Sequence, residues 1–539
     1  MRADPSASRP TSLKDDLQRP AAYASVARAT SVTLVETHVS WVFLLDQDVF
    51  KVKKPVDLGF LDFRTREQRR AACVAEVRLN ARLAPHVYRG VVAVRVGGDG
   101  RACLSGAGPI LDWAVHMARL PDAWRADTLL ATGSLEPSAI DAIAVRLAEF
   151  HDTALSDATT AGFGEPDVIA ANLEENFAQT RHTLGRYLES HESDELVRWQ
   201  TAFLRGHRAL FRQRAAAGRV RDGHGDLRLE HVYLEPSAQV TVLDCVEFND
   251  RFRFADVCAD VAFLTMELAA HGRVDLAERL LAKYARESND FDLYAVIDFY
   301  ESYRAFVRGK IAAMRAADES ADDVTRHLAD VEARRCFLLA LASSRRSLLL
   351  PVVVAVGGVI ASGKSTIAGY IGDAMSAPVI DADRTRKSML GVAPTRAMPE
   401  TPWHGAYDPS FTEEVYAEVL RRAAVVLASG RPVVLDGSFR SPRMRRAARE
   451  LAATYGAPFR FVECRADGSV CRTRLVSREA ELGVSDGRLA IFDAFCARFM
   501  PVTELPSPEH ITIDTTRPTG ETRRVLRAAL DTWPRGFGG

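Results

Sequence analysis

The strongest chemical signal in the sequence is a glycine-rich loop in the second half of the chain. Residues 358–365 match the pattern Gly-x-x-x-x-Gly-Lys-Ser/Thr and lie between an apolar stretch and a helix-forming one. In this pattern backbone amides surround phosphate oxygens, the lysine reaches the terminal phosphates and the serine hydroxyl binds Mg²⁺. The pattern therefore predicts a site for ATP and Mg²⁺, with Ser365 as a metal ligand. The predicted nucleotide-binding residues are Gly358, Val359, Ile360, Ala361, Ser362, Gly363, Lys364, Ser365 and Thr366.

Two aspartates downstream of the loop can serve the same site. Asp436 ends the apolar stretch Val433–Leu435, a position that suits a carboxylate holding Mg²⁺ or its water. Asp383 follows another predicted strand, at the sheet edge where such folds bind ligands. There Asp383 can accept the proton of a substrate hydroxyl, and Arg386 can hold a phosphate. The alternative is that Asp381 or Asp383 only caps the next helix.

Two arginines further along the chain suggest a lid over the transferring group. Arg474 and Arg478 are four residues apart on a predicted helix and so share one face. Such a pair can close over the phosphoryl group and spread its negative charge in the transition state. A solvated basic helix face is the alternative interpretation.

The first half carries a second set of residues suited to phosphoryl transfer. Asp226 lies in a His-Gly-Asp sequence, and Asp244 ends a later predicted strand. At such a site one carboxylate accepts the substrate proton and the other holds Mg²⁺ on the nucleotide. Upstream, Lys51 lies within a predicted strand and Glu76 on the next predicted helix, where it can pair with the lysine. Lys53 lies on the same strand face, so the choice between the two lysines stays open.

These residues have to be positioned by two different folds. From residue 25 to about 120 the pattern predicts short strands around one helix, and from about 121 to 342 mostly amphipathic helices. Residues 343–350 are predicted to be a linker. In residues 351–535 short apolar strands alternate with helices, which predicts a parallel sheet covered on both faces. Residues 1–24, rich in proline and polar residues, are expected to be a disordered tail.

The fold class expected from this order is α/β and α+β in one chain. The spacing of apolar residues also predicts the bounds of individual helices and strands. The predicted helices include 64–83, 135–151, 169–190 and 195–216, and the predicted strands of the last domain are 352–356, 378–382, 433–435, 460–464 and 511–513.

Composition restricts the partners and the compartment. The chain has 539 residues, with 70 Lys and Arg against 71 Asp and Glu, so it shows no bulk attraction for nucleic acids or membranes. Its eight cysteines form no Cys-x-x-Cys pair, which fits a reducing compartment. The N-terminus lacks the apolar core of a secretory signal, and the apolar stretch 347–360 is too short to span a bilayer. The sequence thus predicts a cytoplasmic protein with a small-molecule substrate, and leaves its oligomeric state open.

With these motifs the second half resembles the small P-loop kinases of the AAA_33 or zeta-toxin-like group, which are related to polynucleotide 5′-hydroxyl kinases. Those enzymes carry an Asp-x-x-Arg after the second strand, matched here by Asp383 and Arg386. They also carry an Arg-x-x-x-Arg lid, matched by Arg474 and Arg478. The resemblance implies that Asp383 activates an acceptor hydroxyl.

The first half resembles the aminoglycoside phosphotransferase-like kinases, which have the two-lobed fold of the protein kinases. The resemblance implies that Lys51 orients the α- and β-phosphates and that Glu76 orients Lys51. It also implies that Asp226 is the catalytic carboxylate and Asp244 the metal ligand. The family pattern has asparagine where this sequence has His231, so a nitrogen replaces an oxygen ligand that Mg²⁺ prefers.

The complete arrangement resembles the bacterial bifunctional aminoglycoside phosphotransferase/ATP-binding proteins. The first hypothesis is an ATP-dependent phosphotransferase with two nucleotide-binding domains, of which the P-loop domain phosphorylates a hydroxyl acceptor. The alternative is a regulatory ATPase whose first half is a degenerate pseudokinase that binds a ligand or partner. Processing of nucleic-acid ends ranks last because the charge is neutral. The sequence identifies neither acceptor.

Overall fold

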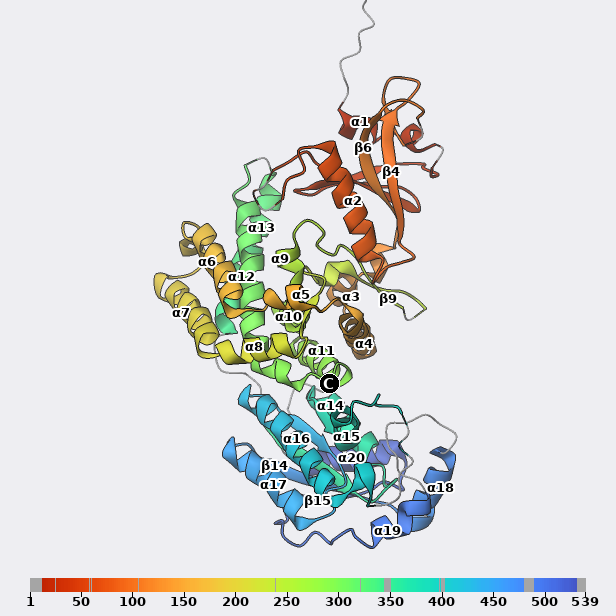
Figure 1. The fold of residues 1–539 in the computed structure, drawn as a ribbon, viewed down its shortest axis with the longest axis vertical. Coiled ribbons are helices and arrows are strands. Elements are labelled where there is room, and N and C mark those ends of the chain that lie inside the picture. Colours follow the sequence, from red (N-terminus) through yellow and green to blue (C-terminus); the bar gives the residue numbers. More distant parts are fainter. Residues whose placement is uncertain are drawn as a thin grey trace, which may run out of the picture. The chain divides into compact units, whose positions relative to one another are not determined.

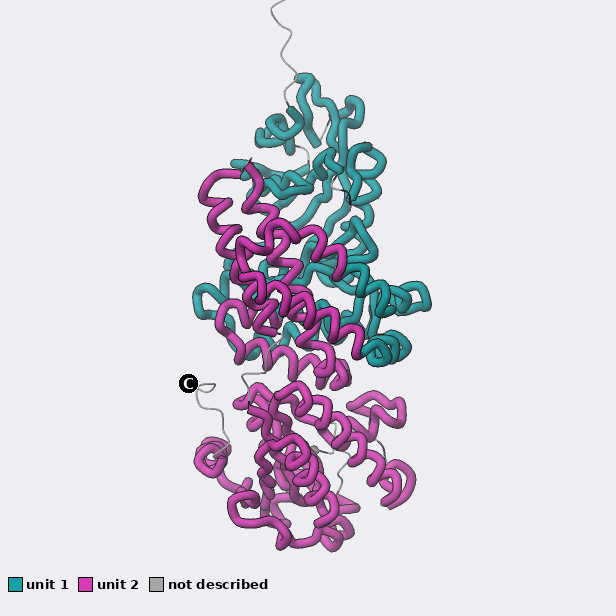
Figure 2. Tube along the Cα trace, turned by 90° about the vertical axis from the view of Figure 1, so that its left-hand side faces the viewer, with its two compact units in different colours: residues 1–172, 207–264 teal, residues 173–206, 265–539 magenta. Residues whose placement is uncertain are grey.

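The computed structural model describes residues 12–530 apart from residues 25, 58, 60, 105, 238, 320, 344–349, 397, 399–402 and 479–488. The fold combines α+β and α/β parts, with an antiparallel sheet early in the chain and a parallel sheet late in it (Figure 1). Two compact units are present: residues 1–172 with 207–264, and residues 173–206 with 265–539 (Figure 2). The division between the units falls within residues 25–342, which the sequence predicts to be one domain, and the predicted domain limits stay a prediction.

The first sheet presents two lysines to one helix. Its strand order is β1-β2-β3-β6-β4-β5, and all its pairs are antiparallel. Phe50 and Val52 of β3 pack in one hydrophobic cluster, whereas Val49 packs in another with Cys73 of α2. Because side chains alternate along a strand, Lys51 and its neighbour two residues on face α2. The bounds are β1 Thr33–Glu36, β2 Ser40–Leu44, β3 Asp48–Lys53, α2 Arg66–Asn80, β4 Tyr88–Val96, β5 Ala102–Cys103 and β6 Ile110–Ala118.

The segment before this sheet is folded. It contains helix α1 (Leu13–Asp16) and the 3₁₀ helix η1 (Pro20–Tyr23). Leu17 and Tyr23 are completely buried in the core of the sheet, and the Tyr23 hydroxyl donates a hydrogen bond to the carbonyl oxygen of Leu17 (2.6 Å). The expected disorder is therefore wrong for residues 12–24, since these two side chains anchor the segment. Residues 1–11 lie outside the described part of the chain.

Helices dominate the middle of the chain. The predicted helix 169–190 ends at Thr180, whose hydroxyl bonds back to the carbonyl of Asn176 (2.9 Å). The predicted helix 195–216 is two helices, because His207 leaves the helical region with φ −115° and ψ 20°. Among the described residues no helix has the length and apolarity needed to cross a bilayer. The helices are α3 Ala126–Ala131, α4 Pro137–Thr153, α5 Ala158–Gly162, α6 Pro166–Thr180, α7 Ser190–Gly206, α8 Arg208–Ala216, α9 Asp250–Arg253, α10 Val257–Ala270, α11 Val274–Glu287, α12 Ile297–Ala316 and α13 Asp323–Ala342.

Short strands interrupt these helices in two places. β7 (Val220–Asp222) pairs with β10 (Phe254–Asp256), and β8 (Val232–Leu234) pairs with β9 (Val240–Val242). This is the β-rich segment in which the predicted carboxylates of the first half lie.

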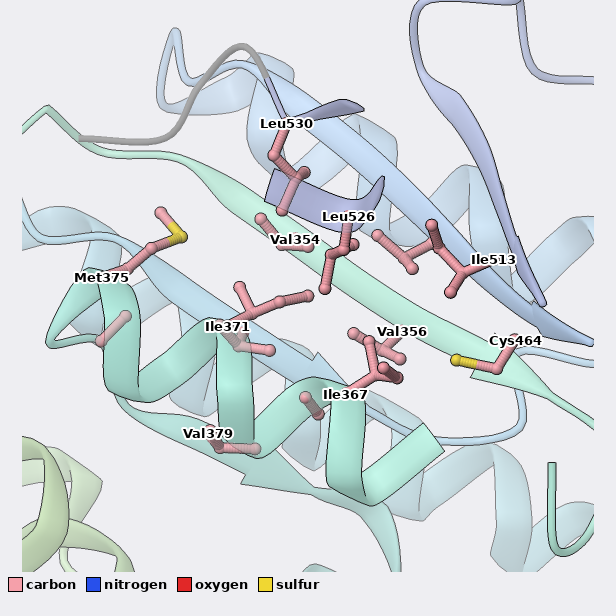
Figure 3. Close-up of a cluster of buried hydrophobic side chains, with 14 of the residues drawn as sticks. Val354, Val356, Ile367, Ile371, Met375, Val379, Cys464, Ile513, Leu526 and Leu530 are labelled. Carbon is pink, nitrogen blue, oxygen red and sulfur yellow. The ribbon is translucent and has the colours of Figure 1, made fainter. Parts of the chain in front are cut away.

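The second sheet is parallel, with the strand order β12-β13-β11-β14-β15. Each of the five strands predicted from short apolar runs overlaps one of these strands. Val354 and Val356 of the central strand pack against Ile367 and Ile371 of α14, and Ile513 completes this core from β15 (Figure 3). Strands buried on both faces require such continuous apolar runs. The strands are β11 Val353–Gly358, β12 Val379–Asp381, β13 Val433–Asp436, β14 Phe459–Arg465 and β15 His510–Asp514.

Seven helices belong to this part of the chain within the described residues. They are α14 Lys364–Met375, α15 Ala382–Met389, α16 Pro409–Ala428, α17 Pro442–Thr454, α18 Gly468–Arg478, α19 Phe492–Cys496 and α20 Thr519–Ala529.

Within the second unit, polar side chains join the region around α11 to helices α15 and α16. Arg384 of α15 bonds to the carboxylate of Glu287 (3.3 Å). The side-chain amide of Asn289 donates to the hydroxyl of Ser388 (2.6 Å) and accepts a hydrogen bond from Arg422 (2.8 Å). Residues that precede the predicted linker therefore hold α15 in place.

A buried ion-pair cluster strengthens the same contact. The guanidinium of Arg431, which lies before β13, is 2.9 Å from a carboxylate oxygen of Glu278 in α11 and 2.9 Å from Asp298 in α12. Arg431 is 5% exposed, and burial raises the pKa of Glu278 despite the nearby guanidinium. A buried charge that loses its partner is strongly destabilising.

Replacing Arg431 by methionine is therefore expected to reduce the free energy of unfolding by about 3 kcal/mol, because Glu278 would remain buried without a counter-charge. Thermal unfolding followed by calorimetry measures the effect. Arg421→Met is the matched control, since its pair with Asp292 is exposed and should contribute about 1 kcal/mol or less. Equal losses of stability in the two variants would contradict the role given to the buried cluster.

A second prediction concerns pH. Burial raises the pKa of Glu301 in α12 from 4.5 to about 8. Between these values the unfolded chain releases the proton while the folded chain keeps it, so stability falls as pH rises from about 4.5 to 8. Glu301→Gln should remove this dependence and raise the melting temperature relative to the unmodified chain at pH 8 more than at pH 5. Glu413→Gln, at an exposed position, should change the two temperatures equally. Parallel curves for Glu301→Gln and the unmodified chain would contradict the prediction.

Candidate functional site

The phosphate loop joins β11 to α14 with the backbone shape that its sequence predicts. Gly358 and Gly363 have φ values of 145° and 85°. A Cβ atom on Gly358 would lie 2.5 Å from the carbonyl oxygen of Cys464, so only glycine fits there. Lys364 begins α14, and its Nζ donates to the carbonyl oxygen of Val359 across the loop (3.1 Å). The ammonium group therefore lies where terminal phosphates would bind.

The loop also contains a polar atom that a ligand can satisfy. The hydroxyl of Ser362 is buried and has no hydrogen-bond partner among the described residues. Such a hydroxyl costs about 1–3 kcal/mol unless an acceptor or donor reaches it. Beside the loop, a cavity of about 500 Å³ is lined by Gly358, Val359 and the ends of β14 and β15. This volume is usual for small-molecule sites.

Two carboxylates lie side by side at the carboxyl ends of β12 and β13. Asp381 and Asp436 are partners in the strand register. Asp381 also caps α15 by accepting a hydrogen bond from the backbone N–H of Arg384 (2.8 Å). Burial and the charge of Asp436 raise the pKa of Asp381 to about 6. Burial also raises the pKa of Asp436, although Lys364 and the hydroxyl of Ser365 favour its ionised form.

This buried pair fits a divalent cation. Within the described residues, no group of three or more His, Cys, Asp or Glu side chains is placed to hold a metal. Mg²⁺ commonly takes one or two carboxylates and completes its shell with phosphate oxygens and water. Asp436 and Ser365 have the positions expected of metal ligands, and Asp381, predicted only as a helix cap, lies beside them.

Asp383 lies on the same edge, in the first turn of α15. Together with burial, its charge raises the pKa of Asp436 and of Tyr416, which indicates that it is near both. Arg386, one turn further, is buried and donates to the carbonyl oxygen of Ala406. Asp383 is thus close to the Asp381–Asp436 pair, where a base for a substrate hydroxyl is needed. Its role as that base stays a prediction.

The predicted lid is described in part. Arg474 of α18 donates to the carbonyl oxygens of Ala361 (3.2 Å) and Thr515 (2.7 Å). It therefore contacts the backbone of the phosphate loop directly. Arg478 ends α18, and its side chain lies outside the described residues.

In the first unit the predicted lysine and glutamate are in contact. Lys51 Nζ lies 3.0 Å from Glu76 Oε1 and also pairs with Asp244. Burial alone would lower the pKa of Lys51, but Asp244 and Glu76 raise it well above its usual value. Lys53 is fully buried and pairs with Glu76 and Glu247. The two lysines therefore share one glutamate.

A cavity of about 220 Å³ distinguishes the two lysines. Lys51 lines it together with Asp244, His231 and the segment Met117–Leu120. Lys53 is not among its lining residues. Of the two lysines, Lys51 therefore has access to this cavity, and its role as the nucleotide lysine stays a prediction.

Asp226 and His231 lie in a loop whose backbone is held by hydrogen bonds to the carboxylate of Asp260. The two backbone N–H groups before Asp226 both donate to the carboxylate of Asp260 (2.6 and 2.9 Å). His231 Nδ1 donates to the carbonyl oxygen of Asp226 (2.9 Å), so a neutral imidazole has its lone pair on Nε2. This nitrogen is 3.8 Å from Asp244 Oδ2. The nitrogen–oxygen pair suits Mn²⁺ better than Mg²⁺.

Sequence reasoning did not select several residues of these sites. Glu247 follows Asp244 by three positions, and a second buried lysine on β3 was a signal that another carboxylate is needed. Asp260 carries no local signal, because it lies within the ordinary helical stretch of α10. Asp381 was named only as an alternative cap of the next helix, and the structure confirms that it caps α15.

The chain matches one family model and several known proteins. Residues 353–502 match the family AAA_33, described as an AAA domain. The phosphate loop and the residues Asp381, Asp383 and Asp436 all lie within this matched region. Over 467 residues, 86% of the chain, it is 35% identical to the uncharacterized proteins Rv2004c of Mycobacterium tuberculosis (strain ATCC 25618 / H37Rv) and Mb2027c of Mycobacterium bovis, and covers 89% of each. The chain belongs to the family of these mycobacterial proteins.

The chain is also similar in part to solved kinase structures. A gluconokinase from Sinorhizobium meliloti 1021 is 24% identical, with 35% of this chain and 93% of that chain covered and a TM-score of 0.25. A choline/ethanolamine kinase family protein from Mesorhizobium loti is 14% identical, with 62% and 99% covered and a TM-score of 0.37. The aminoglycoside 2′-phosphotransferase-IIIa is 14% identical, with 60% and 98% covered and a TM-score of 0.36.

Proposed function

We propose that the chain is an ATP-dependent phosphotransferase whose P-loop domain transfers the γ-phosphate of ATP to a hydroxyl group of a small acceptor. The observation that carries this proposal is the meeting of the phosphate loop, the Asp381–Asp436 pair and Asp383 at one edge of the parallel sheet. A loop that only bound nucleotide would not need a further carboxylate, that of Asp383, beside the two aspartates that would hold the metal.

In the proposed reaction, the acceptor oxygen forms a bond to the γ-phosphorus while the bond from that phosphorus to the β–γ bridging oxygen breaks, and ADP leaves. Asp383 takes the hydroxyl proton. Lys364 lies on the phosphates, and Arg474 and Arg478 spread the developing charge. Mg²⁺, when bound through Ser365 and Asp436, would neutralise phosphate charge.

A transfer screen tests this function. The full-length chain is incubated with γ-labelled ATP, Mg²⁺ and separate panels of sugars, sugar acids, aminoglycosides, nucleosides and oligonucleotides. We expect labelled product with at least one small acceptor, and its loss in Lys364→Ala. Hydrolysis of ATP without transfer to any panel would contradict the proposal.

For the first half we propose weak, metal-dependent ATP binding with slow transfer. Lys51 pairs with Glu76 as an active kinase requires, but His231 presents nitrogen to the metal position beside Asp244. In the Lys364→Ala background, His231→Asn should increase the residual transfer, and Mn²⁺ should support it better than Mg²⁺ before that change.

A specific observation favours the alternative of a regulatory pseudokinase. Lys51 pairs with both Glu76 and Asp244, and Lys53 pairs with Glu76 and Glu247, so the cluster neutralises its own charges. If the Lys364→Ala chain binds no ATP with either metal and His231→Asn does not restore binding, the regulatory function replaces catalysis for this half.

A further inference from the structure

Two arginines stack on one tryptophan beside the proposed acceptor base. The guanidinium carbons of Arg440 and Arg498 lie 4.5 and 4.0 Å from the ring centroid of Trp403. Phe495 stacks on the same indole with 6.1 Å between centroids. The backbone N–H of Met500 donates to the carbonyl oxygen of Arg440 (2.9 Å), which joins the two segments that carry the arginines.

These arginines are connected to the edge where transfer is proposed. Arg440 follows β13, whose last residue is Asp436, and the N–H of the preceding Phe439 donates to the hydroxyl of Tyr416 (3.0 Å). Burial and the like charges of Arg498 and Arg386 lower the pKa of Arg440. Arg440 is therefore close enough to Arg386 and to Arg498 to be repelled by both, and the three are called here the arginine cluster.

The arginine cluster lacks negative partners within the described residues. None of its three side chains forms an ion pair with a described carboxylate, and the Nε of buried Arg386 has no hydrogen-bond partner there. Six other buried arginines within the described residues are paired with a carboxylate: Arg69, Arg214, Arg253, Arg422, Arg431 and Arg445. Arg386 is buried, Arg440 half-buried and Arg498 exposed. The free-energy cost of the unpaired like charges therefore falls mainly on Arg386 and Arg440, and a bound anion would reduce it.

The geometry keeps the donors of the cluster available. A guanidinium that stacks on an aromatic face retains its in-plane N–H groups, which match the two oxygens of a carboxylate or phosphate. Trp403 itself has φ 67°, a strained conformation for a residue with a large side chain. Such strain is often kept at ligand sites.

We infer that the arginine cluster binds an anionic group of the phosphoryl acceptor, so that the acceptor is a small molecule carrying both a hydroxyl and a carboxylate or phosphate. This inference rests on the proposed function of the P-loop domain. Arg386 lies one turn from Asp383, so the anion and the reacting hydroxyl belong to one molecule of modest length.

Matched acceptors and variants of the full-length chain test the inference. Glycerol, glycerate and glycerol 3-phosphate, and glucose, gluconate and glucose 6-phosphate, are compared as substrates with Mg-ATP. We expect kcat/KM for an anionic member to exceed that of its neutral analogue by about tenfold or more. Arg440→Met and Arg498→Met should raise KM for that acceptor by about tenfold, with KM for ATP unchanged. The acid and phosphate arms identify which anion is bound.

Arg472→Met is the matched control. Its guanidinium also lies over an aromatic ring, that of Phe492 (4.8 Å), but it pairs with Asp493. It should leave the KM for the acceptor unchanged. Preference for the neutral acceptors, or an unchanged KM in Arg440→Met, would overturn the inference. Phosphorylation of oligonucleotides alone would replace the small acceptor by a nucleic acid.

A binding measurement separates this inference from the proposed function. Inorganic phosphate and glycerate are titrated into the Lys364→Ala chain, with tryptophan fluorescence as readout and Trp403→Phe to identify the signal. Saturable binding that Arg440→Met removes would support the anion site even if no transfer is found. Absence of such binding, together with transfer to neutral acceptors, would retain the function and reject the anion site.

Discussion

Asp383→Asn is expected to slow phosphoryl transfer by about 10²–10⁴, the usual contribution of a positioned general base. The amide has the shape of the carboxyl group but does not accept a proton at neutral pH. Because Asp383 lies within the first turn of α15 while Asp381 provides the cap, the helix should be unaffected. Transfer rates at saturating ATP, ATP affinity by isothermal titration and the melting temperature measure the three parts of this expectation.

The neighbouring aspartate provides a control with a different signature. Asp381→Asn keeps the cap but weakens the carboxylate pair, so it should raise the Mg²⁺ concentration needed for half-maximal rate and have less effect at saturating Mg²⁺. If Asp383→Asn retains full turnover with an unchanged melting temperature, Asp383 does not act as the base.

Lys364→Ala is expected to reduce turnover by about 10²–10³ and to remove most ATP binding at the loop. The Lys364 ammonium donates a hydrogen bond to the Val359 carbonyl oxygen across the loop, and Lys364 is the first residue of α14. Isothermal titration of Mg-ATP into the full-length chain measures the loss of stoichiometry and affinity.

Lys51→Ala tests the other half in the same assay. Because Lys51 lines the cavity of the first unit and contacts two carboxylates there, its replacement should remove only the weaker binding event. If Lys364→Ala binds ATP unchanged and Lys51→Ala loses the tight binding, the principal nucleotide site lies in the first half and the prediction is wrong.

The parallel sheet could be predicted from the sequence because its signals are local. Val353–Gly358 is a continuous apolar run that ends in the phosphate-loop pattern, and such runs are typical of strands buried on both faces. The Lys51–Glu76 contact also followed from order and spacing, since β3 and α2 are adjacent in the chain.

The remaining features depend on contacts between distant segments. Tyr23 anchors a segment of polar and proline-rich composition, and only the tertiary core overrides that composition. Trp403, Arg440 and Arg498 come from three separate loops, so no window of sequence shows that they meet. The prediction of one helix over residues 195–216 was wrong at His207, because the helical periodicity of the sequence continues there although the backbone leaves the helical conformation.

The contacts that hold α15 have a practical consequence for dividing the chain. A cut within residues 344–349 would separate Arg384, Arg422 and Arg431 from Glu287, Asn289 and Glu278. It would also expose to water the surface on which these groups lie. An expression fragment of the P-loop half should therefore begin before Val274, where α11 starts, so that the helix carrying Asp383 retains its native supports.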